Sequence, residues 1–262
     1  MILPIYQVDA FTSKIFSGNP AAVVPLEKWI DDSAMQNIAA ENNLAETAFF
    51  VKENEAYHIR WMTPTVEVPL CGHATLASAY VIFNFIEKDE TKIKFLSKSG
   101  ELFVERDGEM LSLNFPSNKP HETEIPKEIF ECFGKEPVEI LSNGFFLLVV
   151  FDSEDFIKNY QPKIDLLKKI HPDAVIVTAK GNNVDFVSRM FAPNSGIDED
   201  PVTGSAHMVL TPYWSEKLGK KKLNARQISK RGGDLLCEDL GSRIKISGKA
   251  VLYLTGNIYL DL

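Results

Sequence analysis

The distribution of apolar and polar residues along the 262-residue chain predicts short strands separated by a few helices. Apolar runs of strand length, bounded by polar or turn residues, are typical of a sheet with a buried face. One segment differs, because Ala74–Phe85 is apolar nearly all round, which predicts a helix buried on most sides. The runs that predict strands lie at residues 20–25, 48–52, 58–62, 93–95, 102–106 and 111–115, the last two joined by a turn at 106–109.

Other segments complete the expected order of elements. The amphipathic segment Asp31–Asn42 predicts an outer helix capped near Asp31 or Asp32. A second buried helix is expected over 206–218, and the polar, proline-bearing stretch 116–126 predicts a linker. A final strand is expected over 253–260.

The chain also repeats itself. Four blocks of residues match in collinear order at separations of about 130 residues, near half the chain length, and chance similarity between short strands and turns is the alternative explanation. The clearest matches are Arg60 with Arg189, Pro64 with Pro193, Glu67 with Glu199, Pro69 with Pro201, Gly72 with Gly204 and Ala74 with Ala206. We therefore predict two copies of one unit, with residues 1–116 as the N-terminal domain and 117–252 as the C-terminal domain. Residues 253–262 are expected to return to the first domain.

The predicted elements define the fold class. Each copy has short strands, one buried helix and paired strands in the same order, and a mostly antiparallel sheet wrapped round the helix is the simplest packing. The sequence thus predicts an α+β protein of two tandem, pseudo-symmetric domains, each a barrel-like sheet around a central helix.

Composition and charge exclude several classes of function. The formal net charge is −8, and bases and acids are interleaved, so no basic stripe favours a nucleic-acid partner. The three cysteines stand in no CxxC spacing and the five histidines are isolated, so neither a disulfide framework nor a metal site is expected. We expect a soluble, cytoplasmic protein, because no signal peptide or membrane-length apolar run is present.

Two repeated turns are the first candidates for binding. The segments 69–74 and 201–206 place glycine and small residues before a buried helix, where the first backbone amides have no intrahelical partner and favour an anion. Two such turns could hold a carboxylate-bearing substrate from both sides, between the domains. Alternatively, the glycines only allow helix and strand to approach closely. The predicted substrate-binding residues are Cys71, Gly72, Gly204 and Ser205.

Catalytic candidates lie where the copies differ. His73 corresponds to Ser205, and Asp200 precedes Pro201, which places its carboxylate on extended backbone. These two side chains could form a general-acid pair, or they could serve only as a helix cap and a backbone partner. Glu46 follows a helix and precedes Ala48 and two phenylalanines, where a partly desolvated carboxylate suits a proton acceptor. An exposed residue at a strand edge is the alternative.

Four motifs carry a resemblance to a known family. They are 8–11 (VDAF) with 17–20 (SGNP), 46–49 (ETAF), 70–75 (LCGHAT) and 199–206 (EDPVTGSA). On these residues the chain resembles the phenazine biosynthesis PhzF-like proteins, relatives of diaminopimelate epimerase. The resemblance implies the diaminopimelate-epimerase-like fold and a homodimeric isomerase without cofactor or metal. It also implies that Glu46 shuttles the proton and that His73, Asp200 and Ser205 lie near the substrate.

The sequence therefore predicts a cofactor-independent isomerase that moves a proton on a small acidic metabolite, with Glu46, His73 and Asp200 as catalytic residues. An epimerase or racemase is the alternative enzyme. The racemase relatives use one cysteine from each half, and this chain has Cys71 in the first half but Thr203 at the matching position. A ligand-binding protein without turnover is the alternative outside enzymes.

Overall fold

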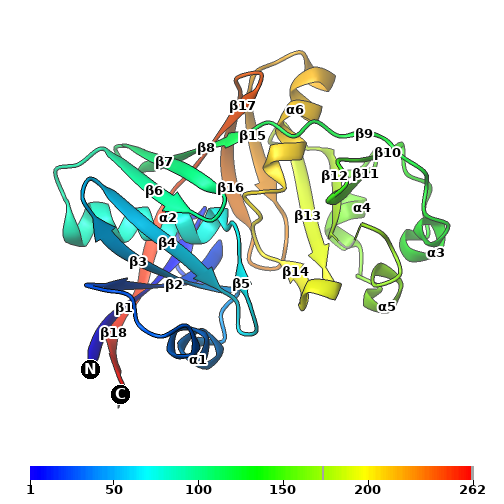
Figure 1. Cartoon of the computed structure of the whole chain (residues 1–262). Helices are drawn as coiled ribbons and strands as arrows, with labels where there is room; N and C mark the ends of the chain where they lie inside the picture. The colour runs from blue at the N-terminus through cyan, green and yellow to red at the C-terminus, as the bar shows by residue number, and fades with distance from the viewer. Residues whose placement is uncertain (173, 261–262) are drawn as a thin grey trace. The chain divides into compact units, whose positions relative to one another are not determined.

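The computed structural model describes residues 1–172 and 174–260, so residues 261–262 of the predicted returning segment lie outside the described residues. The chain divides into two compact units (Figure 1). Unit 1 comprises Met1–Asn114 and Ser247–Leu262, and unit 2 comprises Phe115–Ile246. Among the described residues, no helix is both long and apolar enough to cross a membrane.

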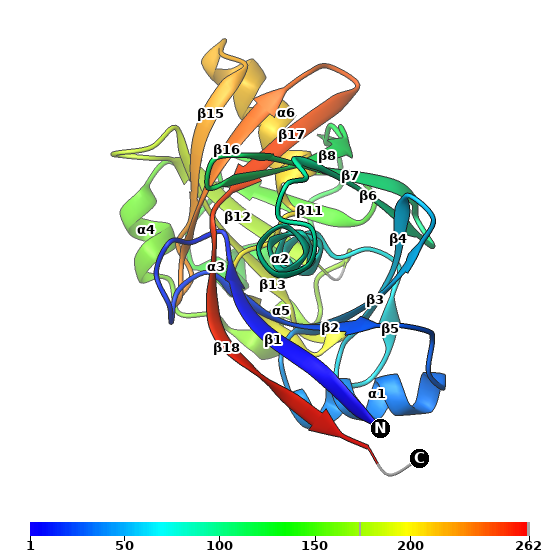
Figure 2. The ribbon, with the colours of Figure 1, turned by 90° about the vertical axis from the view of Figure 1, so that its left-hand side faces the viewer.

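Unit 1 is a sheet wound round one helix. Figure 2 shows helix α2 end-on, with the strands of the unit around it. The elements are β1 (Ile2–Ala10), β2 (Asn19–Leu26), α1 (Asp32–Asn42), β3 (Glu46–Glu53), β4 (Ala56–Met62), β5 (Glu67–Val68), α2 (Gly72–Val81), the π-helix η1 (Ile82–Ile86), β6 (Lys92–Ser97), β7 (Gly100–Asp107), β8 (Met110–Pro116) and β18 (Ala250–Tyr259).

Neighbouring strands of unit 1 pair mostly antiparallel. The pairs β1–β2, β3–β4, β4–β5, β6–β7 and β7–β8 are antiparallel, whereas β2–β3 and β4–β6 are parallel. Each parallel pair spans a helix, α1 in the first case and α2 in the second, as a crossover connection requires. The last strand, β18, pairs antiparallel with β1 from Ala250 to Tyr259, which brings the two ends of the chain together (Figure 1).

Unit 2 repeats this order. Its elements are β9 (His121–Glu122), α3 (Glu128–Phe133), β10 (Glu139–Ser142), β11 (Phe146–Val150), α4 (Glu154–Asn159), α5 (Ile164–Leu167), β12 (Ala174–Lys180), β13 (Phe186–Ala192), the 3₁₀-helix η2 (Pro193–Ser195), β14 (Ile197–Asp200), α6 (His207–Leu218), β15 (Lys222–Gln227), β16 (Gly233–Asp239) and β17 (Arg243–Gly248). The pairs β10–β11, β12–β13, β13–β14 and β15–β16 are antiparallel, and β11–β12 and β13–β15 are parallel. Strands β10 to β16 therefore repeat the pairing pattern of β1 to β7.

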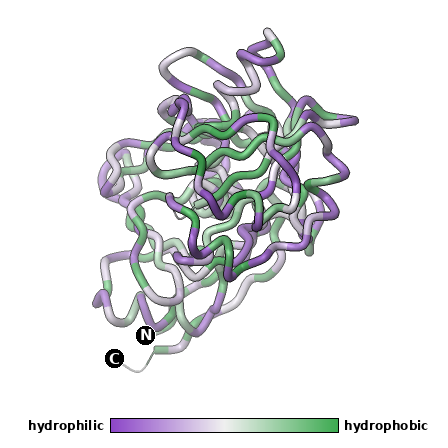
Figure 3. The backbone as a smooth tube through the Cα atoms, turned by 90° about the vertical axis from the view of Figure 1, so that its right-hand side faces the viewer, coloured by the Kyte–Doolittle hydropathy of each residue, from purple (hydrophilic) through white to green (hydrophobic). Residues whose placement is uncertain are grey.

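Apolar side chains stabilise each unit from within. In unit 1, Met35 and Ile38 of α1 pack with Phe49 and Val51 of β3. Unit 2 has its own cluster, in which Phe133 of α3 and Ile157 of α4 pack against strands β11 to β13. Burying one such side chain stabilises the fold by about 1.5–3 kcal/mol. Figure 3 shows the hydrophobic segments, in green, gathered on inner strands, while many outer turns are hydrophilic.

The predicted elements agree with the structure in type and differ at their ends. The chain is a mixed α+β protein, six of the seven predicted strands fall within observed ones, and the seventh, predicted over 253–260, is observed as β18 over Ala250–Tyr259. The first central helix begins at Gly72 rather than Ala74, so His73 belongs to its first turn. The segment 116–126, predicted as a linker, contains the short strand β9.

The start of α1 is as predicted, but the expected side-chain cap is not formed. Asp31 occupies the N-cap position but makes no capping hydrogen bond with its side chain. The Asp32 carboxylate instead accepts a hydrogen bond from Arg60 Nη1 at 2.7 Å. An ion pair with a strand residue thus replaces the local contact that the sequence pattern suggests.

Candidate active site

Strand β3 directs Glu46 towards the central helix. Glu46 is the first residue of the strand and pairs with Ala21 of β2 in parallel register. Successive strand residues face opposite sides, and Phe49 and Val51 pack against α1, so Glu46 and Ala48 face the other side. Helix α2 contacts β3 on that side. The Glu46 carboxylate is consequently buried, with 12% of its side chain exposed.

The first turn of α2 presents His73 to this carboxylate. His73 Nε2 lies 3.2 Å from Glu46 Oε2, and only 5% of the His73 side chain is exposed. The two groups form an ion pair when the imidazole is protonated. Sequence analysis singled out both residues separately, and the fold brings them into contact.

Cys71 and Asn19 lie on the other edge of the imidazole. Cys71 Sγ is 3.5 Å from His73 Nδ1, and Asn19 Nδ2 is 3.1 Å from the same nitrogen. Asn19 is completely buried at the start of β2. Asn19 stands in the SGNP motif of residues 17–20, and nothing in that motif identifies His73 as its neighbour. Asn19, Glu46, Cys71 and His73 together are called the imidazole cluster below.

Burial and charge set the protonation of the cluster. Burial raises the pKa of the Cys71 thiol, and the Glu46 carboxylate raises it further. The His73 imidazole and the backbone amide of Ala74 lower this pKa, but by less. Burial opposes the charged form of His73, but the facing Glu46 carboxylate favours it, and the pKa of His73 is held well above its ordinary value. A thiol with a raised pKa is neutral at neutral pH, so the lasting negative charge beside His73 is that of Glu46.

The same atoms include donors that a metal ion could use. One donor atom each from Glu46, Cys71 and His73 lies within 4.8 Å of the others, and thiolate, imidazole and carboxylate are ligands of zinc. Cys71 faces Nδ1, however, whereas Glu46 faces Nε2. Because a single imidazole nitrogen binds a given ion, this arrangement does not fit one ion held by all three residues. The expectation of a metal-free site stays a prediction.

The remaining predicted residues lie in unit 2. Asp200 ends β14, and its carboxylate accepts a hydrogen bond from the Thr203 hydroxyl. Gln227 holds the turn from β15, since its Nε2 donates to the Asp200 carbonyl at 2.7 Å and its Oε1 accepts from the Thr203 amide at 2.9 Å. Sequence analysis missed Gln227, which no local pattern distinguishes. Gly204 is buried and Ser205 is half-buried in the turn before α6. Their roles, and that of Asp200, stay predictions.

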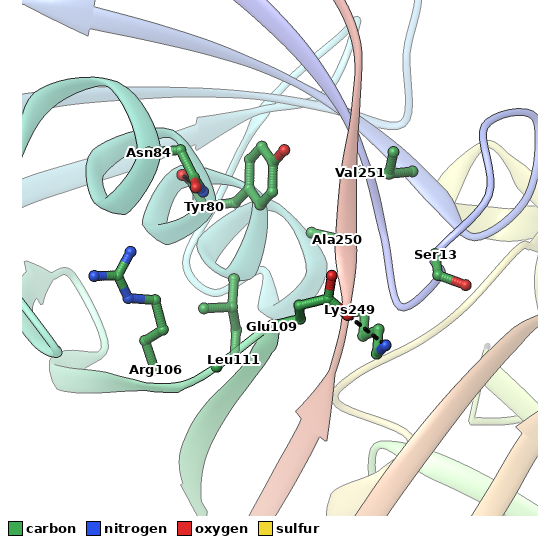
Figure 4. Close-up of a pocket in the computed structure, with 10 residues that line it drawn as sticks. Ser13, Tyr80, Asn84, Arg106, Glu109, Leu111, Lys249, Ala250 and Val251 are labelled. Carbon is green, nitrogen blue, oxygen red and sulfur yellow. Dashed lines mark hydrogen bonds and ion pairs between the residues drawn. The ribbon is translucent and has the colours of Figure 1, made fainter. Parts of the chain in front are cut away.

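Unit 1 also contains a cavity of about 310 Å³ away from these residues (Figure 4). Tyr80, Asn84 and Leu111 line it, and a Lys249–Glu109 ion pair with an Nζ–Oε2 distance of 2.6 Å lies at its side. Tyr80 follows His73 by two turns of α2, or about 10 Å along the helix axis. The lining includes no member of the imidazole cluster. The cavity is therefore separate from the candidate active site.

The chain is similar over its whole length to proteins of one described family. The family model "PhzC-PhzF: Phenazine biosynthesis-like protein" matches residues 8–256. A Pseudomonas aeruginosa protein named an uncharacterized isomerase is 49% identical over 261 residues, covering 100% of both chains. An uncharacterized isomerase from Halalkalibacterium halodurans is 44% identical over 264 residues, covering 99% of this chain and 100% of the relative.

Solved structures give the same picture of the fold. The crystal structure of a PhzF-family phenazine biosynthesis protein from Enterococcus faecalis has a TM-score of 0.96 and 46% identity, covering 99% of this chain and 100% of the other. A probable proline racemase from Agrobacterium radiobacter has a TM-score of 0.67 at 11% identity, covering 99% of this chain and 93% of that one. The second likeness is one of fold alone.

Proposed function

The chain belongs to the phenazine biosynthesis-like (PhzF) family, some similar members of which are named uncharacterized isomerases, and we propose that it moves a proton on a small carboxylate-bearing metabolite with Glu46 as acid and base. The observation that carries this proposal is the buried Glu46–His73 pair at the start of α2. A carboxylate removed from water and facing one imidazole nitrogen is placed as a general base must be.

The proposed reaction uses two features of the helix start. Glu46 takes a proton from one carbon of the substrate and returns it to another, while the imidazole of His73 holds the carboxylate in position. The negative charge that develops on the substrate is stabilised by the first amides of α2, at Gly72 and His73, which have no partner within the helix. The positive end of the helix dipole acts in the same direction.

Residues of unit 2 enter the proposal as substrate-binding groups. We assign Asp200, Gly204 and Ser205 to contacts with the substrate, together with Cys71 and Gly72 of unit 1. The support for this assignment is the family motif on which these residues stand and the burial of Asp200 and Gly204. A homodimer without cofactor completes the proposal, as the family resemblance implies.

The repeated strand pairing supports an origin by internal duplication. In unit 1, Arg60 Nε and Nη2 donate to the two oxygens of Glu67, both at 2.9 Å. In unit 2, Arg189 makes the same bidentate contact with Glu199, at 2.7 and 2.9 Å. We infer two pseudo-symmetric copies of one ancestral unit, because both the pairing order and this ion pair recur.

Replacement of Glu46 tests the proposed chemistry. The active protein is incubated with a metabolite extract in heavy water, and mass spectrometry identifies compounds that gain one mass unit. With such a compound as substrate, Glu46→Gln is expected to lower turnover about 100- to 10,000-fold, because it removes the base and keeps the shape. Glu53→Gln is the matched control, since Glu53 lies on the same strand but is exposed. Near-full turnover by Glu46→Gln would exclude Glu46 as the base.

Cys71 favours one alternative, an epimerase that inverts a single carbon. Its raised pKa makes it a neutral thiol, and such a group can donate a proton. Deuterium incorporation at a single stereocentre with racemisation, abolished by Cys71→Ala, identifies the epimerase. Tight binding of a metabolite without any deuterium exchange identifies a ligand-binding protein.

A further inference from the structure

Asn19 is held in one position by its neighbours. It is completely buried, begins β2 and pairs with Ala10 of β1. The preceding Gly18 has φ +67°, and a Cβ there would lie 2.2 Å from the Ala10 carbonyl oxygen. Only glycine fits such a position. The backbone at Gly18 therefore fixes where the Asn19 carboxamide lies. Nδ2 of this carboxamide is 3.1 Å from His73 Nδ1.

The two nitrogens of the His73 ring face groups of opposite kind. An amide nitrogen only donates hydrogen bonds, and a carboxylate only accepts them. Nδ1 meets the Asn19 amide nitrogen and Nε2 meets the Glu46 carboxylate. An acceptor is therefore required at Nδ1 and a donor at Nε2.

We propose that Asn19 is a positioning residue that keeps the proton of neutral His73 on Nε2, the ring nitrogen that faces Glu46 at 3.2 Å. The role deepens the proposed function and rests on it, because Glu46 is the group that this N–H faces. The positive end of the N–H dipole is then directed to the side of the ring on which the carboxylate lies.

The other groups that face His73 in unit 1 agree with this assignment. Cys71 Sγ lies on the Nδ1 side, and a neutral thiol also donates to an acceptor nitrogen. Glu46 is the acidic group on the Nε2 side. Asn19 therefore disfavours a second proton on Nδ1, whereas the charge of Glu46 favours it. The equilibrium between the two forms of His73 depends on this opposition.

The nitrogen-15 NMR spectrum of the intact protein tests the tautomer without any substitution. Histidine-labelled protein is titrated to a pH above the His73 pKa, and His73→Gln assigns its signals among the five histidines. We expect an unprotonated, pyridine-like Nδ1 and a protonated, pyrrole-like Nε2. A pyrrole-like Nδ1 in the neutral form would overturn the proposal.

The Asn19→Asp variant tests the cause. It preserves shape but turns the donor into a charged acceptor, so the His73 titration midpoint should move up by about one pH unit or more. In the pH profile of kcat, the limb that reports the titration of His73 should shift to higher pH by the same amount. Asn84→Asp is the matched control, because Asn84 lies in η1, which follows α2, and donates to the Tyr80 carbonyl away from His73. An unchanged midpoint in folded Asn19→Asp also rejects the proposal.

The two proposals fail in different ways. If the tautomer is as expected but Glu46→Gln keeps full turnover, Asn19 controls His73 and Glu46 is not the base. If Glu46→Gln loses turnover but Nδ1 of neutral His73 carries the proton, Glu46 is the base and Asn19 does not determine the tautomer of His73. Each measurement therefore decides one proposal.

Discussion

The arginine that links strand and helix occupies the same place in both units but a different environment. Arg60 of β4 binds Glu67 and reaches Asp32 of α1, whose side chain is 78% exposed. Arg189 of β13 binds Glu199 and instead donates to the carbonyls of Ile157 and Tyr160 at the end of α4, at 3.0 and 2.6 Å. The Arg189 side chain is 8% exposed and that of Arg60 is 20% exposed. The shared Arg–Glu contact is thus half-buried in both units, and the units differ in the second partner of the arginine, which is exposed in unit 1 and buried in unit 2.

The helix starts differ in the same way. In unit 1 the first turn of α2 contains His73, beside a carboxylate and a thiol. In unit 2 the matching position is Ser205, and the histidine of this region is His207, the first residue of α6. His207 Nδ1 donates to the Thr203 carbonyl at 2.8 Å, and burial lowers the pKa of His207 to about 4. One buried histidine faces charge while the other bonds a neutral carbonyl. The difference teaches that one ancestral framework can carry a reactive group in one copy and a packed one in the other.

Removing each arginine gives the largest expected contrast between the units. Arg189→Met should lower the free energy of unfolding by about 3–5 kcal/mol, because it leaves the buried carbonyls of Ile157 and Tyr160 without a donor and Glu199 without its partner. Arg60→Met should cost no more than about 1 kcal/mol, since its second partner, Asp32, is exposed to water. Chemical denaturation of both variants and wild type measures the difference. Equal losses would show that the buried carbonyl contacts of Arg189 do not distinguish the units.

The buried histidines should give opposite pH dependences. The folded-state pKa of His207 lies below the ordinary value of 6.5, so its contribution is present above pH 6.5 and is lost as the pH falls through 4. A shift of this size corresponds to about 3 kcal/mol. The free energy of unfolding of wild type minus that of His207→Gln should therefore fall across this range.

His73 should show the reverse. Its folded-state pKa is raised, so its contribution is present below pH 6.5 and is lost as the pH rises through the folded-state value. Wild type minus His73→Gln should decrease towards alkaline pH. Two curves with the same sign of slope would contradict the comparison of the two helix starts.

Helix caps give the smallest contrast. Ser153 caps α4, and its Oγ accepts from the Phe156 amide at 3.2 Å. Asp31 stands at the same position of α1 without such a bond. Ser153→Ala should cost about 1 kcal/mol. Asp31→Ala should change stability by less than about 0.5 kcal/mol. Thermal unfolding of both variants tests this, and a larger loss for Asp31→Ala would show a capping role that the contacts lack.

Local pattern was sufficient for most elements of unit 1, for helix α6 and for most of the residues that meet in unit 1, whereas the short helices α3 to α5 were not predicted. The apolar run after Gly72 predicted α2. Cys71 and His73 were singled out because the two copies of the repeat differ at these positions. The N-cap position of α1 was predicted, but the contact of Asp32 with Arg60 was not, because it joins residues 28 positions apart and no local pattern contains it. Gln227 was missed for the same reason, since its partners belong to a turn 24 residues earlier in the chain.

By itself, the sequence determined the succession of strands and helices, the repeated motifs and the types of reactive residue, because these depend on periodicity and on chemistry at single positions. Only the tertiary structure decided which of them touch. The register of β2 with β3 and the packing of α2 against them bring Asn19 and Glu46 to the two nitrogens of His73, although Asn19 and His73 are 54 residues apart. Protonation is likewise decided by the fold, because burial and neighbouring charge shift a pKa and neither exists in the extended chain.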